Sequence, residues 1–229
     1  MVGRAAAPRI AEQVALVRSR VGAACERAGR AQGSVTLIAV SKTQPASAML
    51  EAAAAGIADF GENYAQEAIP KLERLQAAGA PGLAMHFIGH LQTNKARVVT
   101  ERFDLLHSVD SERLLDAIAA ASGGSRIRLM LQVNTSGEAT RGGVDPSALD
   151  QLVRHARSLR EIELVGLMTI PAHSNDPEQN RPAFRRLREL AQTHGLAGLS
   201  MGMTDDFEVA IEEGATHVRV GRAIFGERY

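Results

Sequence analysis

The sequence predicts a single (β/α)8 barrel with an additional helix at its N-terminal end, and three observations favour this fold class. Short β-branched runs alternate with longer helical stretches along the whole chain. Eight such strand–helix units fit within the 229 residues. No Pro/Gly/Ser-rich linker and no change of composition divides the chain, so residues 1–229 are expected to form one domain. A doubly wound open sheet is the alternative, because periodicity does not show whether a sheet closes.

The elements follow from these patterns in chain order. Residues 10–30 carry Val14, Val17, Val21 and Cys25 at helical spacing and form the additional helix, which ends before a glycine. The expected strands are 35–40, 59–61, 85–88, 105–109, 127–134, 162–168, 199–201 and 217–220. The helical stretches between and after them are 46–55, 64–78, 94–101, 112–121, 146–157, 182–194 and 205–213.

Composition and charge restrict the class of protein. Hydrophobic residues make up 45% of the chain and charged residues 23%, which is typical of soluble globular proteins. The 26 basic and 26 acidic residues cancel, so no global attraction to nucleic acid or to an anionic membrane is expected. Charged residues from Arg4 to Arg18 interrupt any signal peptide, and no apolar run is long enough to span a membrane. We therefore expect a cytoplasmic protein without a disulfide, since Cys25 is the only cysteine. A monomer is expected, although no pattern in the sequence determines the oligomeric state.

Lys42 is the first candidate for chemistry. It follows the strand at 35–40, and the two-residue period of a strand places it on the same face as Ile38 and Val40. The C-terminal ends of the strands form the active face of a (β/α)8 barrel, so Lys42 is expected at the barrel mouth. A partly desolvated amine there can form a Schiff base with a carbonyl compound. The simpler interpretation is a lysine that reaches out to solvent.

The loops after the last two strands are candidates for a phosphate-binding site. Gly202 and Gly221 allow the backbone to approach an anion closely, and Ser200 adds a hydroxyl. The helix expected from residue 205 opens with two aspartates, which already complement its dipole and would repel a phosphate. The anion is therefore expected nearer residues 221–223. The alternative is that both glycines only permit tight turns.

Arg219 is expected to point into the barrel beside this phosphate-binding site. It shares its face of the strand with Gly221, while Val218 and Val220 take the other face. An inward arginine needs an anion or a hydrogen-bond acceptor as partner. In a protein that binds pyridoxal phosphate, an arginine beside the pyridine nitrogen would be such an arrangement. A salt bridge to an acidic barrel residue such as Asp59 is the alternative.

Other motifs carry less weight. Residues 89–96 are not a P-loop, because Asn94 replaces the second glycine and Ala96 replaces the Ser/Thr. The seven histidines show no metal-site spacing beyond the step from His86 to His90, which crosses a strand end. We therefore interpret the histidines as structural and expect no metal.

Six stretches of the chain match one known family in order. They are residues 39–43 (AVSKT), 61–64 (GENY), 86–95 (HFIGHLQTNK), 166–168 (GLM), 199–203 (LSMGM) and 218–226 (VRVGRAIFG). Together they resemble the pyridoxal phosphate homeostasis proteins over nearly the whole chain. The resemblance implies a barrel like the N-terminal domain of alanine racemase, with Lys42 holding pyridoxal 5′-phosphate as an internal aldimine. It also implies the remaining cofactor-binding residues, which are Asn63, Met168, Ser200, Gly202, Arg219 at the pyridine nitrogen, Gly221 and Arg222.

Two residues depart from the family pattern. Arg222 stands where the family often has a small hydroxylated residue, so a hydroxyl contact is lost while the backbone N–H can still meet the phosphate. Arg141 stands where many relatives have lysine, which keeps the positive charge but removes the amine. Neither departure removes a residue on which cofactor binding is expected to depend.

The resemblance implies a carrier rather than an enzyme. In the alanine racemase arrangement a tyrosine from another domain supplies the second base, whereas this chain has only Tyr64 and Tyr229, its last residue. An arginine at the pyridine nitrogen also weakens the electron sink that amino-acid chemistry uses. We therefore assign no catalytic residue and expect a role in intracellular vitamin B6 homeostasis, with delivery to recipient apo-enzymes. The alternatives are a small pyridoxal phosphate-dependent amino-acid racemase and a Schiff-base aldolase in which Lys42 attacks a phosphorylated sugar.

Overall fold

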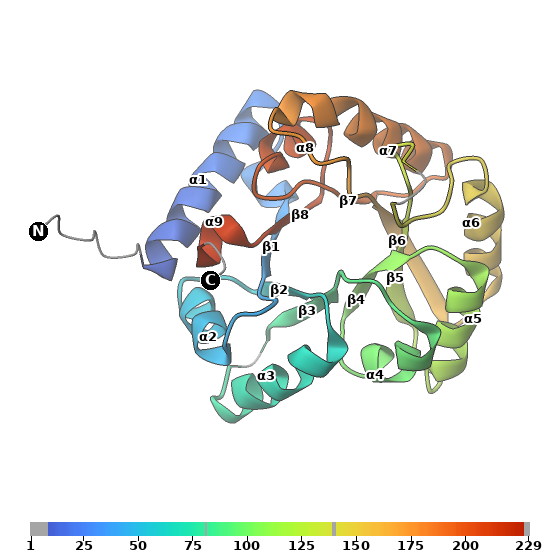
Figure 1. Ribbon diagram of the computed structural model, residues 1–229, viewed down its shortest axis with the longest axis horizontal. Helices are drawn as coiled ribbons and strands as arrows, with labels where there is room; N and C mark the ends of the chain where they lie inside the picture. The colour runs from blue at the N-terminus through green and yellow to red at the C-terminus, as the bar shows by residue number, and fades with distance from the viewer. Residues whose placement is uncertain (1–8, 81, 139–140, 227–229) are drawn as a thin grey trace, which may run out of the picture.

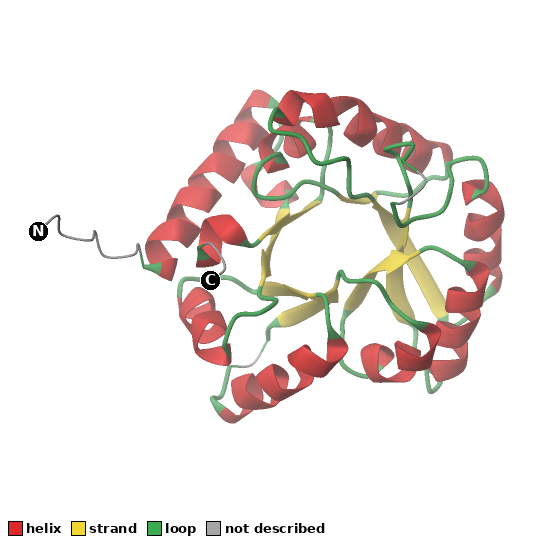
Figure 2. Cartoon of the chain, in the orientation of Figure 1, coloured by secondary structure: helices red, strands yellow, loops and turns green. Residues whose placement is uncertain are grey.

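The computed structural model describes residues 9–80, 82–138 and 141–226, and in these residues eight parallel strands close into a barrel in sequence order. The ring of strands is surrounded by helices, as Figures 1 and 2 show. The predicted (β/α)8 barrel is confirmed, and the open sheet is excluded because β1 pairs with both β2 and β8. The strands are β1 (Thr36–Val40), β2 (Asp59–Glu62), β3 (Ala84–Phe87), β4 (Leu105–Val109), β5 (Ile127–Gln132), β6 (Ile162–Met168), β7 (Gly198–Ser200) and β8 (His217–Val220).

Helices follow the strands around the outside of the barrel (Figure 1). The described α-helices are α1 (Ile10–Arg27), α2 (Ala46–Ala54), α3 (Ala65–Ala77), α4 (Ala96–Thr100), α5 (Glu112–Ala121), α6 (Leu149–Ser158), α7 (Arg181–Thr193), α8 (Phe207–Glu212) and α9 (Arg222–Phe225). Short 3-10 helices are η1 (Gln32–Ser34), η2 (Thr93–Lys95) and η3 (Pro177–Asn180). None of the helices in the described ranges is both long and apolar enough to cross a membrane.

Among the helices that begin later than the sequence predicts, α6 and α8 do so because aspartates hold the preceding residues in turns. The Asp145 carboxylate accepts the Ser147 N–H at 2.8 Å, so the stretch expected to be helical from residue 146 first forms a turn and α6 begins at Leu149. The Asp206 carboxylate likewise accepts the Met203 N–H at 2.7 Å, and α8 begins at Phe207 rather than at residue 205.

The predicted additional helix, α1, packs on the outside of the barrel against α2, α8 and α9. Its apolar stripe of Val14, Val17, Val21 and Cys25 is buried, as the helical spacing predicts. The helix therefore covers the seam where the last strand of the barrel closes against the first (Figure 1).

Alternation along each strand separates two environments. On β8, Val218 and Val220 are buried in the core that the strands form with the surrounding helices, and Arg219 points into the barrel. A smaller apolar cluster of Leu105, Met130 and Met168 fills part of the barrel interior. The barrel is thus packed, and inward polar side chains such as Arg219 share its interior with this apolar cluster.

Candidate functional site

A cavity of about 470 Å³ opens at the C-terminal ends of the strands, the end of the barrel where the sequence predicts a site. Its lining comprises Val40, Lys42, Gln44, Asn63, Ile88, Ile170, Met203, Thr204, Asp205, Arg219, Gly221, Arg222, Phe225 and Gly226. The predicted site residues Lys42, Asn63, Arg219, Gly221 and Arg222 therefore come together around one cavity. Three others, Met168, Ser200 and Gly202, do not line it.

The loop that carries Lys42 is held at both sides. The Ser41 N–H continues the strand ladder to the Gly61 carbonyl at 3.0 Å. Thr43 has a φ of 66°, in the left-handed region that a β-branched residue rarely adopts. The Thr43 N–H donates to the Glu67 carboxylate on α3, which holds this conformation. The loop geometry thus places the half-buried Lys42 side chain in the cavity wall.

A buried ionic cluster lies behind this loop. The Lys71 ammonium donates to the Ser41 carbonyl at 2.8 Å, to Glu62 Oε1 at 2.9 Å and to Glu67 Oε1 at 2.5 Å. Burial raises the pKa of Glu62, and the hydrogen bonds from Lys71 and Ser41 oppose that rise. Each donor of the Lys71 ammonium therefore has an acceptor, and this lysine supports the loop from outside the cavity.

Sequence reasoning missed this cluster, although a signal was present. Lys71 lies three residues after Ala68 and four before Leu75, which are both buried positions of the apolar stripe of α3. A lysine on the buried stripe of a helix needs a carboxylate partner, and Glu62 in the neighbouring motif at 61–64 provides it.

Arg219 forms part of the cavity wall and is only 4% exposed. It donates from Nη1 to Ser200 Oγ at 2.7 Å and from Nη2 to the Thr169 carbonyl at 2.9 Å. Burial lowers its pKa to about 10, opposed by the charge of Asp206. Among the described residues it forms no ion pair, and the expected alternative partner, Asp59, is bound to His86 Nε2 at 3.0 Å. The salt-bridge interpretation of Arg219 is therefore wrong.

The last loop presents backbone donors to the cavity. Gly221 precedes α9, and the first N–H groups of a helix have no acceptor within that helix. A Cβ at position 221 would lie 3.3 Å from the Val40 carbonyl, so glycine permits the close approach of β8 to β1. The Arg222 side chain forms an ion pair with Asp205, and both residues line the cavity. Asp205 is therefore neutralised by an arginine and not by the dipole of α8.

The Ser200 hydroxyl lies in the barrel interior and not in the cavity. The residue is fully buried, and Oγ accepts the Arg219 hydrogen bond while lying 2.8 Å from His107 Nδ1. Because the Ser200 hydroxyl lies outside the cavity, its position does not support the predicted contact with a phosphate. The hydroxyl orients Arg219 instead.

Met168 and Gly202 also act from outside the cavity. Met168 is fully buried with Leu105 and Met130, where the cluster supports the cavity-lining Ile170 from below. Gly202 has a φ of 91°, and a Cβ there would approach the Ala210 Cβ to 2.6 Å. Glycine is thus required so that the loop after β7 can pack onto α8. For Gly202 this agrees with the alternative interpretation, in which the glycine permits a tight turn.

Three of the histidines expected to be structural gather inside the barrel. The ring centroid of His86 lies 5.1 Å from that of His107 and 6.2 Å from that of His217. His86 Nδ1 lies 2.9 Å from His107 Nε2. The described residues contain no group of His, Cys, Asp and Glu that could hold a metal ion. Sequence reasoning missed this cluster because the spacing of histidines on different strands does not show that they face one another.

The cavity suits a ligand with a carbonyl group, an anionic group and further polar atoms. Lys42 brings an amine, Arg222 and the first turn of α9 bring donors for an anion, and Arg219 is a buried cation without a carboxylate. Asn63 Oδ1 is also buried and has no hydrogen-bond partner in the protein. An unpartnered buried acceptor and a buried cation both favour a polar ligand at this position.

Comparisons with known proteins agree in family and in fold. The family model "Alanine racemase, N-terminal domain" matches residues 18–229. The pyridoxal phosphate homeostasis protein of Pseudomonas aeruginosa is 46% identical over 223 residues, which cover 96% of each chain. PipY of Synechococcus elongatus, solved with pyridoxal phosphate (PLP) bound, is 39% identical with a TM-score of 0.80 and covers 95% of this chain and 100% of its own. Alanine racemase from Corynebacterium glutamicum, at 20% identity and a TM-score of 0.71, shares the fold; the match covers 96% of this chain and 61% of the racemase.

Proposed function

The chain belongs to the pyridoxal phosphate homeostasis proteins, within the alanine racemase N-terminal domain family, and we propose that it holds pyridoxal 5′-phosphate at Lys42 and delivers it inside the cell. The family resemblance of the six sequence stretches is thereby confirmed. The observation that carries the proposal is that Lys42 and the carboxylate-free Arg219 line the same cavity. When bound, the cofactor supplies an electrophilic aldehyde that condenses with an amine.

The residues of the cavity fit the parts of this cofactor. Lys42 is the amine proposed for the aldehyde, and it is the lysine that lines the cavity. The backbone around Gly221 and Arg222 would hold the phosphate, since N–H groups at a helix start favour an anion. Arg219 would meet the pyridine nitrogen, and Asn63 offers its unpartnered Oδ1. Ser200, Met168 and Gly202 support these residues from behind.

The arrangement favours holding the cofactor over amino-acid chemistry. Tyr64 is 61% exposed and, in the part of the chain that the structure describes, no tyrosine lines the cavity. Tyr229 lies outside the described residues. Asp205, the carboxylate in the lining, is paired with Arg222. A second base opposite Lys42 is therefore missing from the described lining, and Arg219 in place of an acid opposes protonation of the pyridine ring.

The linkage is tested by absorbance and by borohydride reduction of the purified protein with added pyridoxal phosphate. We expect a visible-edge absorbance band that is lost in Lys42→Ala and kept in the control Lys95→Ala. Mass spectrometry after reduction should find the adduct on Lys42, and the assignment is simple because the chain has only Lys42, Lys71 and Lys95. An adduct on either of the other two lysines would contradict the proposal.

Delivery and catalysis are separated by a second experiment. The loaded protein should restore the activity of a pyridoxal phosphate-dependent apo-enzyme more effectively than the same concentration of unbound cofactor. Racemisation of alanine by the loaded protein should stay below about 1 s⁻¹, the low end of ordinary enzyme turnover. A higher turnover with any amino acid would favour the racemase alternative, and binding of a phosphorylated sugar at Lys42 without pyridoxal phosphate would favour the aldolase.

A further inference from the structure

A chain of five polar side chains crosses the barrel interior from one end to the other. It begins at Asp59, the first residue of β2, and ends at Arg219 in the cavity wall. The links are Asp59 Oδ1 to His86 Nε2 at 3.0 Å, His86 Nδ1 to His107 Nε2 at 2.9 Å, His107 Nδ1 to Ser200 Oγ at 2.8 Å and Ser200 Oγ to Arg219 Nη1 at 2.7 Å. The middle of the chain is shielded from solvent, because His107 and Ser200 are fully buried.

With neutral imidazoles, the hydrogens of this chain have a single arrangement. An ionised Asp59 only accepts, so the hydrogen of His86 is on Nε2 and its Nδ1 is an acceptor. His107 must then donate from Nε2, and its Nδ1 becomes an acceptor for the Ser200 hydroxyl. Burial, followed by repulsion from His86, holds the pKa of His107 well below its usual range, so this ring stays neutral. Every donor in the chain therefore points toward Asp59.

This direction matters at Arg219. A guanidinium only donates, so Ser200 Oγ has to present a lone pair to it. Ser200 can do this well when its one hydrogen is donated to His107. In the opposite direction His107 would donate to Ser200, and the hydroxyl hydrogen would lose its partner in this chain. Since Arg219 has no ion pair among the described residues, the Ser200 hydroxyl and the Thr169 carbonyl orient it.

We propose that Asp59, at the end of the barrel opposite Lys42, is a positioning residue for the cofactor site. Through His86, His107 and Ser200, its negative charge fixes the acceptor that orients the Arg219 guanidinium toward the cavity. The effect of Asp59 on pyridoxal phosphate binding rests on the proposed function. The direction of the chain itself is a property of the protein without cofactor.

The barrel also contains a matched control. The ring of His217 lies 6.2 Å from that of His86 and 5.8 Å from that of His107 between centroids, so its surroundings are similar. Its Nδ1 is bonded to Thr216 Oγ1 at 2.8 Å, outside the chain. Burial and repulsion from His86 lower the pKa of this imidazole group most, and the charges of Asp59, Arg128 and Arg219 also act on it. His217→Gln thus perturbs the interior without interrupting the link from Asp59 to Arg219.

The first test is nitrogen-15 NMR of the histidine rings at pH 8 in the protein without cofactor. We expect His107 in wild type to carry its hydrogen on Nε2 alone. Asp59→Asn replaces a pure acceptor by an amide that also donates, so the two tautomers of His107 should mix. Asp59→Glu should restore the single tautomer, and His217→Gln should leave it unchanged. Wild-type His107 with its hydrogen on Nδ1 would overturn the proposal even if no variant folded.

The second test is titration of the same four proteins with pyridoxal phosphate, followed by absorbance. Asp59→Asn should weaken cofactor binding about three- to tenfold and shift the absorbance maximum, while Asp59→Glu and His217→Gln stay within about twofold of wild type. Equal losses in Asp59→Asn and His217→Gln would reduce Asp59 to a merely structural role. If wild type itself failed to bind pyridoxal phosphate, the proposed function would fail while the tautomer result would still stand.

Discussion

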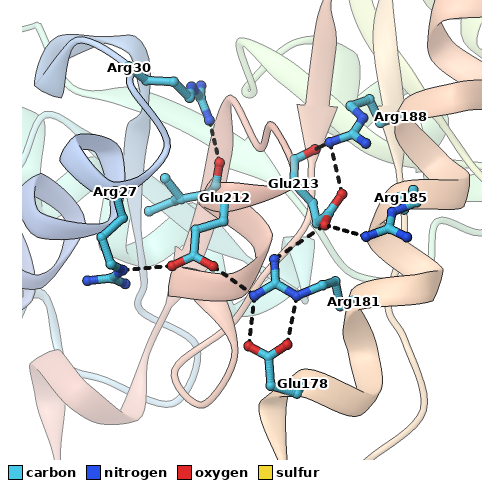
Figure 3. A network of polar contacts seen from close by, with 9 residues as sticks. Arg27, Arg30, Glu178, Arg181, Arg185, Arg188, Glu212 and Glu213 are labelled. Carbon is cyan, nitrogen blue, oxygen red and sulfur yellow. Dashed lines mark hydrogen bonds and ion pairs between the residues drawn. The ribbon is translucent and has the colours of Figure 1, made fainter.

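Two polar networks of this protein use arginine in opposite ways. One is the outer network of arginines and glutamates that joins α1, α7 and α8 on the surface of the barrel (Figure 3). The other is the interior chain from Asp59 to Arg219. In the outer network Glu213, 6% exposed, contacts Arg181, Arg185 and Arg188. In the interior chain the buried arginine meets only neutral acceptors.

The difference indicates which network stabilises the fold and which one affects the binding of a ligand. Paired charges hold these helices together because Glu212 and Glu213 each contact more than one arginine. Glu212, for example, contacts Arg27 at 2.8 Å and Arg181 at 2.7 Å. Those arginines lower the pKa of Glu212, Arg181 most, although burial opposes them. Arg219 has no such compensation, so its burial costs free energy until an acceptor enters the cavity. We expect the outer network to determine folding and the interior chain to determine affinity.

The largest expected effect separates the buried histidines His107 and His217 from the outer network by pH. Burial and repulsion from His86 lower the pKa of His217 to about 4 and hold that of His107 well below 6.5. The unfolded chain therefore binds more protons below pH 6.5, so the stabilisation is complete above that pH and is lost as pH falls toward 4. The free energy of unfolding should drop by up to about 2.7 kcal/mol per pH unit for two histidines. Urea unfolding across this range measures the slope.

The variant His217→Gln should remove about half of that slope. The outer glutamates act in a different window, because their pKa values are lowered and their stabilisation is lost only as pH falls below about 4.5. Glu213→Gln should therefore leave the slope between pH 6.5 and pH 5 unchanged. An equal change of slope in both variants would contradict the separation.

The next largest effect concerns Glu213 itself. Burial opposes its ionisation most strongly, yet its arginine partners together lower its pKa. Glu213→Gln leaves those arginines without their shared charge and should lower the free energy of unfolding by about 2–3 kcal/mol. Pyridoxal phosphate affinity should stay within about twofold of wild type. The control Glu101→Gln breaks the exposed pair with Arg97 and should lower the free energy of unfolding by less than about 0.5 kcal/mol.

In contrast to Glu213→Gln, Arg219→Met should lower the affinity for pyridoxal phosphate and leave the stability of the fold intact. Methionine keeps an apolar volume but removes a buried charge that has no carboxylate partner, so the free energy of unfolding should be unchanged or higher. Affinity for pyridoxal phosphate should fall at least about tenfold, which corresponds to about 1.4 kcal/mol. Urea unfolding and absorbance titration of one preparation give both numbers. A large loss of stability with normal affinity would place Arg219 with the outer network instead.

The smallest expected effect is at the edge of the outer network. Arg27 on α1 is half exposed and pairs with Glu212, which keeps its second partner Arg181. Arg27→Gln should lower the free energy of unfolding by only about 0.5 kcal/mol, and high salt should reduce that difference. Unfolding at low and high salt tests this. A loss as large as that of Glu213→Gln would show that α1 depends on this single contact.

Sequence reasoning succeeded where a property repeats along the chain. The alternation on β8 correctly gave Val218 and Val220 one side and Arg219 the other, because side chains on a strand alternate whatever the neighbouring strand is. Lys42 was correctly expected at the C-terminal end of its strand for the same reason. Ser200 was expected to serve a phosphate, and its place beside Arg219 depends on how far β7 and β8 are shifted relative to each other.

The sequence by itself therefore determined the eight alternating strand–helix units and the family, and it correctly placed Lys42, Arg219 and Gly221 at the barrel mouth. Each of these follows from local periodicity or from contiguous motifs. Only the tertiary structure decided which inward side chains touch. Asp59 and Arg219 lie on strands that both pair with β1, and each is registered to Ile38, yet the side chains between them come from β3, β4 and β7. Strand tilt and closure set these contacts, and neither is written in the spacing of any single segment.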